Sequence, residues 1–208
     1  MPDLGLFVAA SALLAIAPGP DVIYVLTRAI AQGRKAGLAA ALGFASGCIF
    51  HTMLAAVGIA ALIRSSELAF DLVRYAGAAY LIWIGIQALR HRSAFSIEGA
   101  SEARALMTIY KQSVIGNMLN PKVTLFFLAF LPQFVNPGAG NIALQLVLLG
   151  VAFMIVTIVV FGAVAIFAAM IGDWIRRKPA IGERLNVFAG ITFIALGIRV
   201  ALPDMAPR

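Results

Sequence analysis

The sequence of 208 residues has little charge and almost no cysteine. Only 12% of its residues are charged, against about 25% in ordinary soluble domains, while 62% are hydrophobic. This composition excludes an ordinary soluble globular domain. Cys48 is the sole cysteine, which excludes an intramolecular disulfide and argues against a membrane thiol–disulfide electron carrier, because that carrier needs a pair of cysteines.

Other absences remove further classes of protein. No Walker-type phosphate loop, dinucleotide fingerprint or zinc-protease motif is present, so no cofactor is expected and ATP-driven transport would need a separate subunit. A membrane enzyme would carry a polar cluster near one interface, whereas the polar residues here lie in the middle of apolar runs. Within those runs only Asp21 and His51 could bind a divalent cation, which is a poor ligand set. No metal site is expected, and a divalent-cation exporter is the weaker alternative.

Six apolar runs are present instead, and each approaches the ~20 residues that a bilayer-spanning helix requires. The sequence therefore predicts an all-α integral membrane protein with six transmembrane helices. The first run lacks a basic leader and is too long for a cleaved signal peptide, so it is taken as the first span. The expected spans are residues 4–26, 38–63, 75–89, 109–131, 142–171 and 185–202.

Basic residues are distributed unequally between the two ends of these spans. Eleven of the 16 lysines and arginines fall in or beside the loops that join spans one to two, three to four and five to six, and four fall on the opposite side. Since basic loops stay in the cytoplasm, both chain termini are predicted to lie outside. The net charge of +7 then reflects contact with a membrane surface and not with nucleic acid.

The first span is interrupted by Pro18-Gly19-Pro20, and Asp21 follows directly. Proline has no N–H to donate, so the carbonyl groups of Leu14 and Ile16 should lose their usual helical partners. A carboxylate inside a bilayer is costly and indicates a functional site. We therefore expect a broken helix whose break carries substrate-binding groups.

A second interruption occurs about a hundred residues later, where Asn120-Pro121-Lys122 lies inside the fourth span and frees the carbonyl group of Asn117. The segments 76–86 and 189–198 are also alike, and the two breaks fall in register with them. We infer two three-helix repeats, residues 1–90 and 108–208, joined by a cytoplasmic linker at 91–107. Because three is odd, the second repeat must be inverted, as in many secondary transporters.

Inverted repeats should bring the two breaks together near the membrane midplane, with Asp21 and Lys122 facing one cavity. Their opposite charges match the ammonium and carboxylate groups of an amino acid. Asp21 could also carry a proton. A direct ion pair between Asp21 and Lys122 is the structural alternative, and the two interpretations are compatible if the substrate breaks that pair.

The other polar residues allow two interpretations each. Asn117 and Asn120 could line the cavity or hold helices together. His51 could relay protons, because imidazole titrates near neutral pH, or form an interhelical hydrogen bond. Glycine-rich helix faces could support a homodimer.

Several stretches of the sequence resemble the LysE/RhtB family of amino-acid exporters. Pro18-Gly19-Pro20-Asp21, 33–37, and Tyr80-Leu81 with Gly85 agree with the family pattern, and 117–134 resembles its Asn-Pro-Lys signature with a Leu-Pro-Gln-Phe tail. The resemblance covers nearly the whole chain. It implies a bacterial inner-membrane protein that exports amino acids by proton antiport. The single Asp/Lys pair favours neutral or hydroxylated substrates, such as threonine, homoserine or leucine.

Overall fold

The computed structural model describes residues 4–17, 19–59, 61, 67–90, 103–168, 170 and 179–202, and in this part of the chain the regular elements are all helices. By length and composition, two continuous helical segments could cross a membrane, Arg34–Gly58 and Ile142–Ile166. Two bent pairs would raise that number to four if each pair is one span. The expected all-helical, apolar character is confirmed.

Both bent pairs break at the prolines that the sequence singled out. The first pair is α1 (Leu4–Ile16) and α2 (Pro20–Gln32), which meet at 60°. The second is α6 (Leu106–Met118) and α7 (Pro121–Leu125) with the turns that extend α7 to Phe134, bent by 47°. Each second helix begins with its proline, because the first helical position needs no N–H donor.

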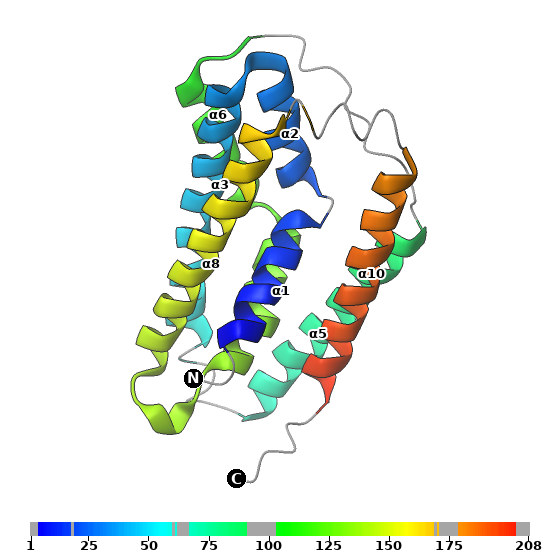
Figure 1. Cartoon of the computed structure of the whole chain (residues 1–208). Coiled ribbons are helices and arrows are strands. Elements are labelled where there is room, and N and C mark those ends of the chain that lie inside the picture. The colour runs from blue at the N-terminus through cyan, green and yellow to red at the C-terminus, as the bar shows by residue number, and fades with distance from the viewer. Residues whose placement is uncertain are drawn as a thin grey trace.

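The remaining helices are longer and unbroken. They are α3 (Arg34–Leu54), which continues as a π-helical turn at Ala55–Ile59, then α5 (Glu67–Arg90), α8 (Ile142–Ile166) and α10 (Pro179–Ala201). Figure 1 shows α5 and α10 side by side, and α3, α6 and α8 packed together beside α1 and α2. The start of α1 and the end of α10 lie at the same end of the molecule, its lower end in Figure 1.

The buried interior differs between the two ends. Near the lower end, six phenylalanine rings pack together, with neighbouring centroids 4.9–6.4 Å apart; they are Phe7, Phe126, Phe127, Phe130, Phe134 and Phe153. Near the upper end the core between α2, α3 and α8 is largely alanine, including Ala29, Ala36, Ala40 and Ala165. Such small side chains allow close approach of helix backbones.

The two similar segments of the sequence pack against each other in a reciprocal way. A Cβ atom added at Gly85 of α5 would lie 2.6 Å from the carbonyl oxygen of Gly190 of α10. A Cβ added at Gly197, which aligns with Gly85 in the two similar segments, would lie 2.8 Å from the carbonyl oxygen of Ala78, next to Gly77, which aligns with Gly190. Reciprocal contacts of this kind arise when a twofold axis relates two elements.

The outer surface of the helices is strongly apolar. Large aliphatic side chains in the middle of α3 and α8 are more than half exposed, among them Ile49, Ile155 and Val159. Water-facing helices normally present polar residues on that surface, so these side chains fit contact with lipid.

Some predicted boundaries are wrong. The first basic loop is much shorter than expected, because α2 continues to Gln32 and α3 begins at Arg34 after one glycine with φ 85°. Arg28, assigned to that loop, is a buried residue of α2. Pro18 and most of the expected linker at 91–107 lie outside the described residues.

Candidate functional site

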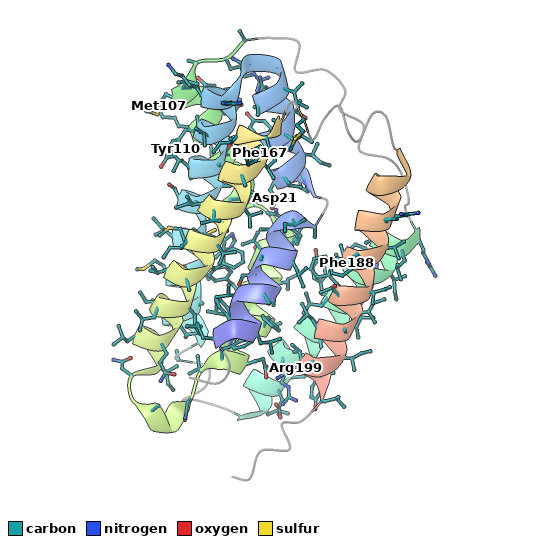
Figure 2. The ribbon with its side chains drawn as sticks, in the orientation of Figure 1. Asp21, Met107, Tyr110, Phe167, Phe188 and Arg199 are labelled. Atoms are coloured by element: carbon teal, nitrogen blue, oxygen red, sulfur yellow. The ribbon has the colours of Figure 1, made fainter. Side chains whose placement is uncertain are left out.

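Asp21 and Lys122 meet where the two broken helices approach each other. Asp21 lies in the first turn of α2 and Lys122 in the first turn of α7; both are buried, with 3% and 7% of their surfaces exposed. Lys122 Nζ donates to Asp21 Oδ1 at 3.2 Å. Asp21 lies near mid-height of the molecule, beside the junction of α1 and α2 (Figure 2). A direct ion pair therefore joins the two predicted charges.

The lysine also uses the carbonyl groups that the first break releases. Lys122 Nζ donates to the backbone oxygen of Leu14 at 3.1 Å and to that of Ala17 at 3.3 Å. The carbonyl group of Leu14 was expected to lack a helical donor, because Pro18 has no N–H. The second carbonyl group that the lysine contacts is that of Ala17, whereas the sequence had predicted that of Ile16. With Asp21, the ammonium group has three acceptors, which is its full donor capacity.

Gly19 is packed directly against this ion pair. A Cβ atom added at position 19 would lie 2.9 Å from Asp21 Oδ1 and 2.9 Å from Lys122 Nζ. The backbone of Gly19 is extended, so its conformation alone does not demand glycine. The requirement is space, because any side chain there would press on both charged groups.

The second break is held in a similar way by a residue of the other half of the chain. His51 of α3 is 1% exposed, and its Nε2 lies 3.0 Å from the carbonyl oxygen of Asn117, the group that Pro121 leaves available. Because a carbonyl can only accept, Nε2 carries the hydrogen. This contact realises the interhelical hydrogen bond that the sequence allowed for His51.

The side chains of Asn117 and Asn120 make different contacts. Asn120 caps α7, since its Oδ1 accepts from the backbone N–H of Lys122 at 3.0 Å. Asn117 Oδ1 and Asn120 Nδ2 are buried without a hydrogen-bond partner among the described residues. Leaving such groups unpaired costs ~1–3 kcal/mol each, so both are available to a bound molecule. Pro121 itself is exposed.

A small cavity adjoins the ion pair, lined by Asp21, Lys122 and Asn117 together with Thr157 and apolar side chains. Its free volume of about 10 Å³ suits a single water molecule and excludes an amino acid. Sequence reasoning missed Thr157, whose signal was a hydroxyl group in the long apolar run of α8. Among the described residues, no group of three His, Cys, Asp or Glu side chains is placed to hold a metal ion.

Packed side chains close the cavity toward both ends. Phe153 lines the cavity and belongs to the phenylalanine cluster on the lower side. Phe161 lines it on the upper side and contacts Phe44, with ring centroids 5.7 Å apart. Aromatic side chains therefore pack on both sides of the cavity.

Comparison with known proteins agrees with these features. The family model described as LysE type translocator matches residues 12–203. The chain is 34% identical to a homoserine/homoserine lactone efflux protein of Salmonella typhimurium, covering 92% of each chain. It is 30% identical to a leucine efflux protein of Enterobacter sp. strain 638, covering 94% of this chain and 93% of the relative. No solved structure matches it significantly. The chain belongs to the LysE-type translocator family of membrane transporters and is not an enzyme.

Proposed function

We propose that the protein exports amino acids from the cytoplasm, with neutral or hydroxylated amino acids as substrates. The observation that carries the proposal is the buried Asp21–Lys122 pair at the junction of two broken helices. The printed names of relatives that span nearly the whole chain, homoserine/homoserine lactone efflux protein and leucine efflux protein, support the same substrate class.

In this proposal the substrate replaces the internal ion pair. Its ammonium group takes the place of the lysine ammonium at Asp21 and at the carbonyl oxygens of Leu14 and Ala17, while its carboxylate binds Lys122. Asn117 Oδ1 and Asn120 Nδ2 offer one further acceptor and one further donor. Replacing the internal ion pair by ion pairs with the substrate should cost little free energy, because the buried charges remain compensated throughout.

Six spans in two inverted repeats are proposed for the membrane arrangement, with the 1–90 and 108–208 units moving against each other. The reciprocal glycine contacts of α5 and α10 and the matching bends of 60° and 47° support it. The distribution of basic residues supports a bacterial inner-membrane protein with both termini outside. The upper end of Figure 1 would then face the cytoplasm.

A transport assay tests the function. Inside-out membrane vesicles that contain the protein, supplied with labelled homoserine, threonine and leucine, should accumulate at least one of them when the lumen is acidic. A protonophore should abolish the accumulation if export is proton antiport. Vesicles without the protein set the background, and labelled lysine and a divalent cation serve as alternative substrates. Accumulation of the cation alone would replace the proposal with metal export.

His51 is proposed to support the second break and not to relay protons. Gln can place an amide N–H close to the position of the imidazole Nε2, so His51→Gln should retain more than about half of the transport rate with an unchanged pH profile. His51→Leu removes the donor and should lower the rate about tenfold, since the buried carbonyl oxygen of Asn117 loses a partner. Transport rates measured between pH 5.5 and 8 check both variants. A His51→Gln protein that moves substrate without protons would assign the relay to His51.

A further inference from the structure

The cavity beside the ion pair has polar lining residues other than the two charged ones. Asn117 and Thr157 line it together with Asp21 and Lys122, and its other walls are apolar. Asn117 is 2% exposed, and its Oδ1 has no hydrogen-bond partner among the described residues. A buried polar atom without a partner is rare in protein interiors and costly, so this oxygen indicates that a further group binds in the cavity.

Thr157 faces the same cavity because of its position in α8. Phe153, Thr157 and Phe161 follow one another at intervals of four residues, which places them on one face of the helix, and all three line the cavity. Thr157 is 3% exposed and is the sole polar residue between positions 146 and 166. A polar side chain in such an apolar, membrane-spanning run indicates a functional position.

The hydrogen bonds of Thr157 show which role remains for its hydroxyl group. Thr157 Oγ1 donates its hydrogen to the backbone oxygen of Phe153 at 2.9 Å, so the hydroxyl oxygen can still accept. Asn117 Oδ1 is an acceptor as well. The Lys122 ammonium already has three acceptors of its own. The two oxygen atoms therefore favour a ligand group that carries a hydrogen.

The size of the cavity limits what this group can be. The free volume of about 10 Å³ suits a group as small as a water molecule. A hydroxyl group has this size and supplies one hydrogen. A methyl group would fill a similar space and leave both oxygen atoms without a partner, which is the usual basis for rejecting an analogue that lacks a hydroxyl group.

We propose that Thr157 and Asn117 are specificity-determining residues, which bind the side-chain hydroxyl group of a hydroxylated amino acid. The inference rests on the proposed function, in which the ammonium and carboxylate groups of the substrate replace the Asp21–Lys122 ion pair. Withdrawal of the lysine side chain makes room for these two groups, and the hydroxyl group enters the adjoining cavity. The site then prefers homoserine to norvaline and threonine to valine, because each second amino acid carries a methyl group in place of the hydroxyl group.

Competition in inside-out vesicles, whose outer surface is the cytoplasmic face, measures this preference. The reporter is whichever labelled amino acid the native protein accumulates. In at least one of the two pairs, the hydroxylated competitor should inhibit uptake at a concentration about tenfold or more below that of its methyl analogue. The ratio of the two inhibition constants is the quantity to compare between variants.

Thr157→Val removes the hydroxyl group with little change of shape and should reduce this ratio about fivefold or more, whereas Thr157→Ser keeps the hydroxyl group and should retain most of it. Thr192→Val in α10 is the matched control. Thr192 Oγ1 makes the same kind of bond, to the backbone oxygen of Phe188 at 2.9 Å, but does not line the cavity, so the ratio should stay at its native value. A purely structural role of Thr157 would lower the transport rate without changing the ratio.

Asn117→Ala tests the second acceptor. This change removes Oδ1 and keeps the backbone carbonyl group that His51 contacts, so it should reduce the ratio in the same direction as Thr157→Val. It also replaces Thr157→Val as the deciding variant if that protein fails to insert into the membrane.

The outcomes separate this inference from the proposed function. Equal inhibition within both pairs, in a native protein that exports amino acids, would overturn the hydroxyl site alone. A ratio that stays at the native value in Thr157→Val, or in Asn117→Ala where that variant decides, would overturn it as well. Native protein that moves no amino acid would overturn the proposed function, and this site with it.

Discussion

Asp21→Asn and Lys122→Met should each lower export about a hundredfold or more and also make the protein less stable. Each change removes one partner of a buried ion pair whose atoms are 3.2 Å apart, and leaves the other charge in an apolar interior. Such a loss costs about 3–5 kcal/mol. Export rates in vesicles and thermal unfolding of the purified variants measure the two effects separately.

The double variant Asp21→Asn/Lys122→Met distinguishes a transport role from a structural one. With both charges removed, no uncompensated charge is left, so the double variant should be more stable than either single variant. It should stay below the native stability, because the carbonyl oxygens of Leu14 and Ala17 have lost the lysine donor. Transport should stay lost, because neither the ammonium nor the carboxylate of the substrate would find its counter-charge. A stable double variant that exports at the native rate would make the pair purely structural. A double variant as unstable as the single ones would point to damage beyond the ion pair.

The contacts at the breaks could be predicted from sequence as far as local chemistry determines them. Proline cannot donate to the residue four positions earlier, so the availability of Leu14 and Asn117 follows from the positions of Pro18 and Pro121 alone. The side chains that donate to those carbonyl groups cannot be predicted from the proline positions. Lys122 reaches Leu14 across more than a hundred residues, and His51 reaches Asn117 across 66, so both pairings depend on how the helices pack.

Arg28 shows why the first loop was predicted to begin too early. A charge next to an apolar run was taken as the start of a loop, but the apolar spacing of Val22, Val25 and Ala29 continues one helical face through it. The guanidinium lies over the Tyr24 ring and donates to Gln32, and these contacts make its burial tolerable. Sequence spacing could have suggested the helix, whereas the partner side chains required the structure.

The contact between α5 and α10 should tolerate no added methyl group at its centre. A Cβ at Gly85 would lie 2.6 Å from the backbone oxygen of Gly190 and 3.0 Å from the backbone nitrogen of Ile194, so the two helices must separate to admit it. Over-packing of this kind costs typically 1–3 kcal/mol. We therefore expect Gly85→Ala to lower the thermal midpoint by roughly 5 °C. Thermal unfolding of the purified protein is the measurement.

Gly190→Ala should lower the midpoint by a similar amount, because its Cβ would lie 2.7 Å from the backbone oxygen of Gly85 in the reciprocal contact. The double variant Gly85→Ala/Gly190→Ala should lower the midpoint by less than the sum of the two single changes, since helices that have already separated can accept the second methyl group more easily. Gly162→Ala in α8 is the matched control: no atom lies within 4 Å of its added Cβ, and alanine favours a helix over glycine by ~1 kcal/mol. It should leave the midpoint unchanged or raise it. A fall of equal size in Gly162→Ala would attribute the effect to glycine replacement in general, whereas opposite signs at Gly85 and Gly162 would assign it to the contact between the two similar helices.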